Sequence, residues 1–130
     1  MIQRQKIESS SVQHFHGDDM LETMFKTQKD FHKRLNPDFE GVPESGREDK
    51  LARTARNIMM EGAELMDQLN WKEWKKTKKQ VEWEQVRYEI ADIMAFLMNA
   101  AIEAGMTAED FFQFYMRKAE VNVKRQENKY

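Results

Sequence analysis

The 130-residue chain contains no cysteine, so disulfide bonds, thiolate metal sites and cysteine nucleophiles are all excluded. Both of its two prolines fall within residues 36–46, together with two of its five glycines, so this stretch is predicted to be a loop. A long hydrophobic run is also missing. The longest apolar stretch, residues 90–102, is interrupted by Asp92 and Asn99 and is too short to span a bilayer.

A strong charge of one sign is absent as well. The formal net charge of -2 gives no global attraction to nucleic acid or to a membrane surface, and the basic cluster within residues 75–79 is short. Residues 1–13 are polar and lack the apolar core of a signal peptide. We therefore expect a cytoplasmic protein, of a bacterium or of a phage-infected host, with neither nucleic acid nor membrane as its partner.

Helical periodicity is what the sequence has instead. Apolar residues recur at helical spacing in four segments, about 18–35, 48–69, 83–104 and 108–126, and no segment has the pattern of a strand. Gly105 is suited to end the third helix, and Thr107 with Asp110 resembles a capping box for the fourth. The prediction is an all-α protein, a bundle of four to five helices, with residues 1–17 as an N-terminal arm and residues 18–130 as one domain.

The predicted helices carry more apolar surface than one small bundle readily covers. The second helix has a stripe that we expect to be buried, and the fourth has another: Leu51, Ala55, Ile58, Gly62, Leu65 and Leu69, then Phe112, Met116, Ala119 and Val123. The third helix is apolar on nearly every side from residue 90 onward, which predicts a central, buried helix. With ten methionines in the chain, this surface predicts a homo-oligomer that associates through apolar helix faces.

Four carboxylates lie in or beside these apolar stripes, as the pairs Glu61 with Glu64 and Glu89 with Asp92. Each pair is spaced i, i+3, so both members share one face of a helix. Uncompensated charges in such surroundings cost several kcal/mol each. A hard divalent cation held by oxygen ligands, Mg²⁺ or Mn²⁺, would neutralise them. Neither pair contains histidine, which argues against a di-iron site.

The alternative is that these carboxylates form local salt bridges with nearby arginines, namely Arg53, Arg56 or Arg87. The fourth helix offers a second polar pattern, because Tyr115, Lys118, Asn122 and Arg125 recur along one side of it. Such a stripe can clamp a metal-bound polyphosphate, or it can be an ordinary solvated face. Trp71 and Trp74 could stack on a nucleobase and Gln28 could hydrogen-bond its edge, although each alone is more often structural.

Four segments carry a more specific signal. Residues 21–28, 60–75, 83–93 and 118–130 resemble the all-α dimeric dUTPase family, which includes the phage dCTPase-dUTPases and belongs with the MazG-like nucleotide pyrophosphohydrolases. The hallmark of that superfamily is Glu-x-x-Glu followed after a gap by Glu-x-x-Asp. The resemblance implies a MazG-like bundle and Mg²⁺-dependent hydrolysis of dUTP or dCTP to the monophosphate and pyrophosphate. It also implies a homodimer, which can pair into a homotetramer.

The resemblance assigns roles to residues at matching positions. The metal ligands would be Glu61, Glu64, Glu89 and Asp92, with Glu64 orienting or deprotonating the attacking water and Glu61 beside it in catalysis. Contacts to phosphate and sugar would come from the C-terminal segment, through Lys118, Asn122, Arg125 and Tyr130. The base would lie near Gln28, His32, Phe25 and Trp74. His32 stands where dUTPase members carry asparagine, so dUTP and dCTP both remain open as substrates.

Two other functions are compatible with the residues. One is a MazG-like house-cleaning hydrolase that accepts many nucleoside triphosphates. The other is a non-catalytic helical interaction module, in which the acidic pairs only fix helix packing. A panel of triphosphates separates the first from a pyrimidine-specific enzyme, and metal titration identifies the second.

Overall fold

The computed structural model describes residues 19–35 and 47–128, and these residues form four α-helices and no strand. The helices are α1 (Met20–Leu35), α2 (Arg47–Asp67), α3 (Trp83–Glu103) and α4 (Ala108–Glu127). The predicted all-α class is confirmed, and the predicted helix ends agree with the observed ones to within two residues. The expected arm at residues 1–17, the loop at 36–46 and Tyr130 lie outside the described residues.

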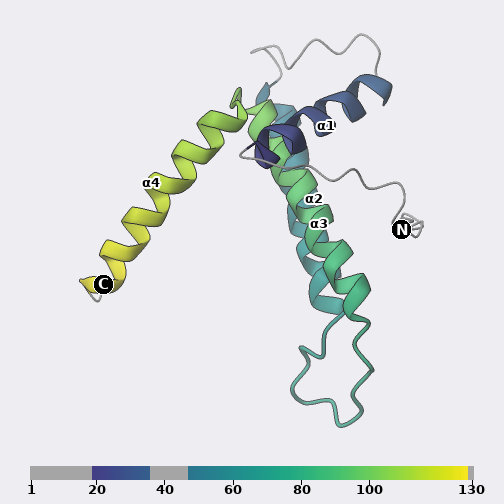
Figure 1. Ribbon diagram of the computed structural model, residues 1–130. Helices are drawn as coiled ribbons and strands as arrows, with labels where there is room; N and C mark the ends of the chain where they lie inside the picture. The colour runs from purple at the N-terminus through teal and green to yellow at the C-terminus, as the bar shows by residue number, and fades with distance from the viewer. Residues whose placement is uncertain (1–18, 36–46, 129–130) are drawn as a thin grey trace.

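Helices α2 and α3 form an antiparallel hairpin and lie side by side along their whole length (Figure 1). The segment between them, residues 68–82, is closed by reciprocal hydrogen bonds between Asn70 and Lys79. The Asn70 amide donates to the Lys79 carbonyl oxygen at 2.9 Å, and the Lys79 backbone N–H donates to Asn70 Oδ1 at 3.0 Å. This clasp fixes the end of the hairpin without a strand pair.

A sharp corner joins α3 to α4, and the helix axis turns there by 106°. Gly105, at φ 80°, ends α3 in the left-handed conformation that glycine adopts without a steric penalty. The backbone N–H of Gly105 donates to Ile102 and that of Met106 to Ala101, which is the Schellman pattern. Thr107 then starts α4, and the predicted capping box with Asp110 is confirmed.

The hydrophobic core lies at this corner rather than along the length of a bundle. Buried Phe25 of α1 packs with three buried residues of α3, and its ring lies 5.7 Å from that of Phe111 in α4. The members of this cluster are Phe25, Met98, Ala101 and Ile102, with Leu21, Met94, Met106, Ala108 and Phe111 packed around them. Helix α1 therefore contacts both α3 and α4 where they meet (Figure 1).

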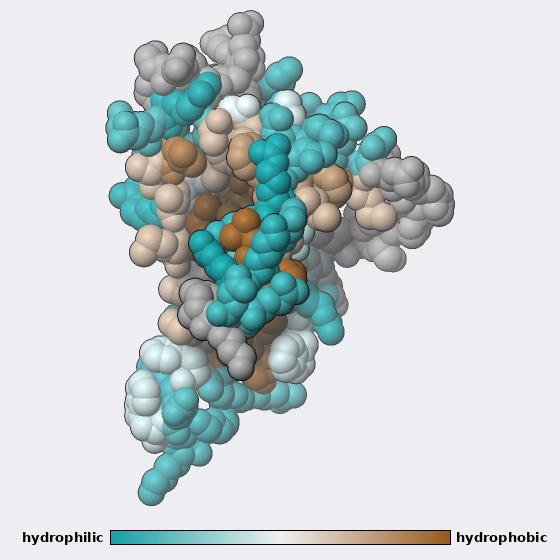
Figure 2. Space-filling view, turned by 90° about the vertical axis from the view of Figure 1, so that its left-hand side faces the viewer, coloured by the Kyte–Doolittle hydropathy of each residue, from teal (hydrophilic) through white to brown (hydrophobic). Residues whose placement is uncertain are grey.

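Helix α4 diverges from the hairpin beyond the corner, and none of its residues is buried (Figure 1). The prediction that its apolar stripe is buried is therefore wrong within a single chain: Phe112 is 48% exposed, Met116 49% and Val123 57%. Figure 2 shows apolar side chains open to solvent on this side of the molecule, beside hydrophilic ones. The stripe has the right spacing for burial, but no element of the described chain covers it.

Two further burial predictions need correction. In α2, Ala55 is exposed, and the buried residue is its neighbour Thr54, whose hydroxyl donates to the buried Glu103 carboxylate at 2.5 Å from Oε1. The other five residues of the expected stripe are partly buried, so the prediction fails only at Ala55 and in the degree of burial. Helix α3 is not covered on every side, since Ile90 is 53% exposed.

Among the described residues, no single helix is both long and apolar enough to cross a membrane. Helices α3 and α4 pass that test of length and composition only when taken together, across their sharp corner.

Candidate active site

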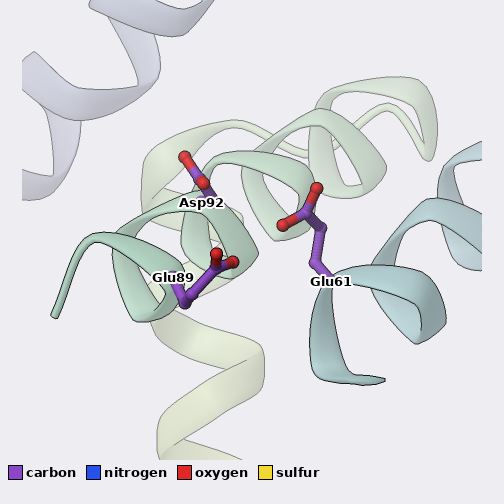
Figure 3. Close-up of side chains that lie close together, drawn as sticks. All are labelled: Glu61, Glu89 and Asp92. Atoms are coloured by element: carbon purple, nitrogen blue, oxygen red, sulfur yellow. The ribbon is translucent and has the colours of Figure 1, made fainter. Parts of the chain in front are cut away.

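Three of the four predicted carboxylates meet between α2 and α3. Glu61 projects from α2 toward Glu89 and Asp92, which project from successive turns of α3 (Figure 3). One oxygen from each residue can be chosen so that all three lie within 4.8 Å of one another. We call Glu61, Glu89 and Asp92 the carboxylate cluster. Glu89 is only 4% exposed, whereas Glu61 and Asp92 are half-buried, so the cluster is deep but open on one side.

The carboxylate cluster brings like negative charges close together in a partly buried place. Burial, followed by the negative charges of Glu64 and Asp92 and a hydrogen bond with Glu89, raises the pKa of Glu61 from about 4.5 to about 7. A hydrogen bond between two carboxyl groups requires that they share a proton. In addition, Glu61 Oε2 is buried with no hydrogen-bond partner within the part of the chain that the structure describes.

These features fit a hard divalent cation. The donor set is all oxygen, as Mg²⁺ and Mn²⁺ prefer, and the described residues bring no histidine to it. Glu61 Oε2 is buried and has no hydrogen-bond partner among the described residues, so it is available to a cation. A group whose pKa is raised by neighbouring negative charge is one that a cation would return to its ionised form. The three carboxylates could therefore hold a divalent cation.

Glu64 is placed differently from the other three carboxylates. It lies one turn after Glu61 on α2, is exposed, and is not among the residues whose oxygens converge. Its charge nevertheless contributes to the raised pKa of Glu61, second only to burial. Glu64 thus lies at the solvent side of the carboxylate cluster. The arginines that could instead form local salt bridges with these carboxylates, Arg53, Arg56 and Arg87, are all exposed.

Two of the three expected base-contacting residues on α1 converge on a residue of α3 that was not among the predicted site residues. The Gln28 side-chain amide donates to Asn99 Oδ1 at 2.8 Å, and His32 Nε2 lies 2.6 Å from the same oxygen. Because that oxygen only accepts, His32 Nε2 carries the proton in this arrangement. Asn99 follows Asp92 by seven residues, so it lies on the same face of α3, about 10 Å further along.

Asn99 could have been identified from the sequence as an uncharged polar residue within an apolar helix, on the same helix face as Asp92. The other two expected base contacts lie elsewhere. Phe25 is buried in the core at the corner, while Trp74 is 72% exposed in the segment that closes the far end of the hairpin. Trp74 packs edge-on against Trp71, with ring centroids 5.8 Å apart.

The expected phosphate contacts are not brought to the carboxylate cluster within one chain. Lys118, Asn122 and Arg125 are all exposed on α4. Given the 106° turn and a rise of about 1.5 Å per residue along each helix, the backbones of Lys118 and Asp92 lie on the order of 20 Å apart. Two side chains cannot bridge that separation. Tyr130 lies outside the described residues.

Comparison with known proteins gives two matches and one negative result. A protein-family model described as dUTPase matches residues 20–111, a stretch that includes α1, the carboxylate cluster and Asn99. The dCTP pyrophosphatase of Enterobacteria phage T4 is 37% identical over 46 residues, which is 35% of this chain and 27% of the phage protein. The chain thus aligns with only about a quarter of that relative's length. No solved structure matches the chain.

Proposed function

Because the chain belongs to the dUTPase family, we propose that it hydrolyses a pyrimidine deoxynucleoside triphosphate, dUTP or dCTP, to the monophosphate and pyrophosphate. The observation that carries this proposal is the carboxylate cluster, whose three oxygens within 4.8 Å and raised Glu61 pKa call for a cation. Family membership supplies the reaction class, and the name of the phage relative supports a pyrimidine substrate.

In this mechanism Glu61, Glu89 and Asp92 would hold Mg²⁺, or Mn²⁺ in its place, and the bound ion would supply neutralisation of phosphate charge and acidification of water. Glu64, exposed at the solvent side of the cluster, orients the attacking water or takes its proton. The oxygen of the water bonds to one phosphorus of the α–β anhydride, and the bridging oxygen leaves with the other phosphoryl group. The products are the monophosphate, pyrophosphate and a released proton.

Gln28 and His32 are proposed to contact the base. Their common partner Asn99 lies on the same face of α3 as Asp92, about two helical turns away, a separation suited to a nucleotide whose phosphates reach the carboxylate cluster. With its amide N–H group donating to Asn99, Gln28 has its carbonyl oxygen left to accept a hydrogen bond from a ligand. An acceptor at this position favours the amino group of cytosine over the carbonyl oxygen of uracil.

The test is a panel of the common deoxynucleoside and ribonucleoside triphosphates with Mg²⁺, in which pyrophosphate and monophosphate are quantified separately. We expect equimolar products from dCTP or dUTP and at least 100-fold lower kcat/KM for purine nucleotides. Comparable activity on dATP or dGTP would replace this proposal with a broad-specificity hydrolase. Inactivity on every nucleotide, with no effect of Mg²⁺ or Mn²⁺ on the melting temperature, would favour a non-catalytic helical module.

A further inference from the structure

The segment that joins α2 to α3, residues 68–82, concentrates positive charge at one end of the hairpin, away from the hydrophobic core (Figure 1). Between residues 70 and 80 it contains five lysines and one glutamate, a formal charge of +4 in a chain whose net charge is -2. The rest of the chain therefore carries -6. The net charge, from which we expected no nucleic-acid partner, averages over these two unlike parts.

Aromatic side chains lie among these lysines. All three tryptophans of the chain are in this segment or directly after it, and each is exposed: Trp71 by 40%, Trp83 by 59% and Trp74 by 72%. Trp71 and Trp74 meet edge to face, with ring centroids 5.8 Å apart and planes at 89°. An indole as exposed as that of Trp74 is not a core residue, and its open ring surface can stack on a planar aromatic ligand.

The segment is held in one shape by its own hydrogen bonds. Lys78 Nζ donates to the Lys72 carbonyl oxygen at 3.1 Å, and the Lys75 backbone N–H donates to the same oxygen at 3.2 Å. Trp71 Nε1 donates to Asp67 Oδ1 at 3.2 Å. With the clasp at the end of the hairpin, these bonds surround a hollow of about 380 Å³ lined by four lysines. A loop that is already ordered loses little conformational entropy on binding.

Lysines interleaved with exposed indoles fit single-stranded nucleic acid. Ammonium groups attract phosphates and indole rings stack on unpaired bases, and a single strand offers both at short intervals. A duplex keeps its bases stacked on one another, so only the lysines could engage it. An anionic membrane fits less well, because the two tryptophans are the only apolar side chains between residues 70 and 80.

We propose that residues 68–83 form a binding surface for single-stranded nucleic acid, distinct from the carboxylate cluster. Trp74, which the family resemblance places near the substrate base, stacks on a base of the strand, and the lysines around the hollow contact successive phosphates. The described residues that line the hollow include no member of the carboxylate cluster. The segment begins where α2 ends, six residues and about 9 Å of helix beyond Glu61.

Tryptophan fluorescence measures binding at this surface directly, because the chain has no tryptophan elsewhere. The full chain is titrated with an oligothymidylate of about 12 nucleotides, in the presence of a chelator. We expect saturable quenching as bases stack on indole rings. The slope of log affinity against log salt should be about -2 to -3, as for three or four phosphate contacts. No quenching at low salt would overturn the proposal.

Paired lysine variants locate the contact, with affinity measured by the anisotropy of a labelled oligothymidylate. Lys75→Ala combined with Lys79→Ala should weaken binding at least tenfold and reduce the salt slope by about 1. The clasp uses only backbone atoms of Lys79, so alanine preserves it. Lys50→Ala combined with Lys124→Ala makes the same change in net charge on α2 and α4, and affinity should stay within about twofold of wild type. Equal losses in the two double variants would overturn the proposed location.

Three further comparisons identify the ligand and separate this surface from the carboxylate cluster. Trp74→Ala should weaken oligothymidylate binding about tenfold and Trp74→Phe less than about threefold, since phenylalanine still stacks. Glu61→Gln should bind like wild type, and a tenfold loss there would place the strand in the active site and overturn the proposal. A duplex of the same length should bind at least tenfold more weakly. Binding to phosphatidylserine vesicles without binding to oligothymidylate would assign the surface to membranes instead. Circular dichroism confirms that each variant is folded.

Discussion

At the scale of single residues, the raised pKa of Glu61 makes the stability of the protein depend on pH. With the pKa of Glu61 raised to about 7 in the folded protein, that state binds more protons than the unfolded chain between about pH 4.5 and 7. Its contribution to stability is therefore present below about pH 4.5 and is lost as the pH rises through about 7. A bound cation would remove this loss.

The Glu61→Gln variant tests this predicted loss of stability with rising pH. In chelator-treated protein, glutamine cannot ionise, so the variant should gain stability relative to wild type as the pH is raised from 5 to 8. The expected relative gain is on the order of 2 kcal/mol after solvent screening of a half-buried group. Urea denaturation at the two pH values measures it. A difference between variant and wild type that does not change with pH would contradict the raised pKa of Glu61.

Asn99 is expected to act on base preference rather than on catalysis. Asn99→Leu removes the oxygen that receives both Gln28 and His32, so the Gln28 amide is free to turn. The ratio of kcat/KM for dCTP to that for dUTP should fall about tenfold, the value of one hydrogen bond. Asn99→Asp keeps an acceptor oxygen and should keep the ratio within about threefold. An unchanged ratio in the leucine variant would remove Asn99 from base recognition.

These residues show what sequence reasoning reaches and what it misses. The carboxylate cluster was predictable because i, i+3 pairs in apolar helices are costly, and that cost can be read from the sequence. Asn99 was missed because its role depends on two residues of α1, more than 65 positions earlier in the chain. No local pattern encodes a contact of that range.

At the scale of elements, the ends of the helices were predictable because the contacts that set them are local in sequence. Gly105, Thr107 and Asp110 act through backbone atoms a few residues away, so their order in the sequence is sufficient to place the corner. The angle of that corner was not predictable. Phe25 of α1 packs against Phe111 at this corner, a contact between helices distant in sequence that no local pattern encodes.

Gly105→Ala tests the corner directly. A Cβ atom there would meet only the Arg47 guanidinium at 3.5–3.6 Å, which is ordinary contact, so the penalty comes from the left-handed backbone. The free energy of unfolding should fall by about 1–2 kcal/mol. Gly62→Ala, a matched change inside α2 with no atom within 4 Å of the new Cβ, should raise it by up to about 1 kcal/mol. Equal effects on urea denaturation would contradict the assigned role of Gly105.

At the scale of the whole molecule, the apolar stripe of α4 was identified correctly as a stripe and assigned incorrectly to the core of one chain. Periodicity shows that a face will be covered, but it does not show by which chain. Phe112, Met116 and Val123 are each about half exposed, so the described residues do not cover this stripe.

Met116→Asp should therefore separate the protomers. A carboxylate in the middle of the apolar stripe would be desolvated on association, so the dissociation constant should rise at least 100-fold. Light scattering across a range of concentrations measures the mass. Lys124→Gln, on a different side of α4, should remain dimeric. A wild-type mass equal to one chain at every concentration would contradict the homo-oligomer predicted from the sequence.

The most direct test of the central claim compares two glutamate variants in one assay of Mg²⁺-dependent pyrophosphate release from dCTP and dUTP. Glu61→Gln removes a ligand from the carboxylate cluster, and Glu84→Gln makes the same change at an exposed position near the start of α3. We predict at least a 100-fold loss for Glu61→Gln and a rate within about twofold of wild type for Glu84→Gln, since one metal ligand contributes several kcal/mol to the barrier. Full turnover by Glu61→Gln would contradict the account.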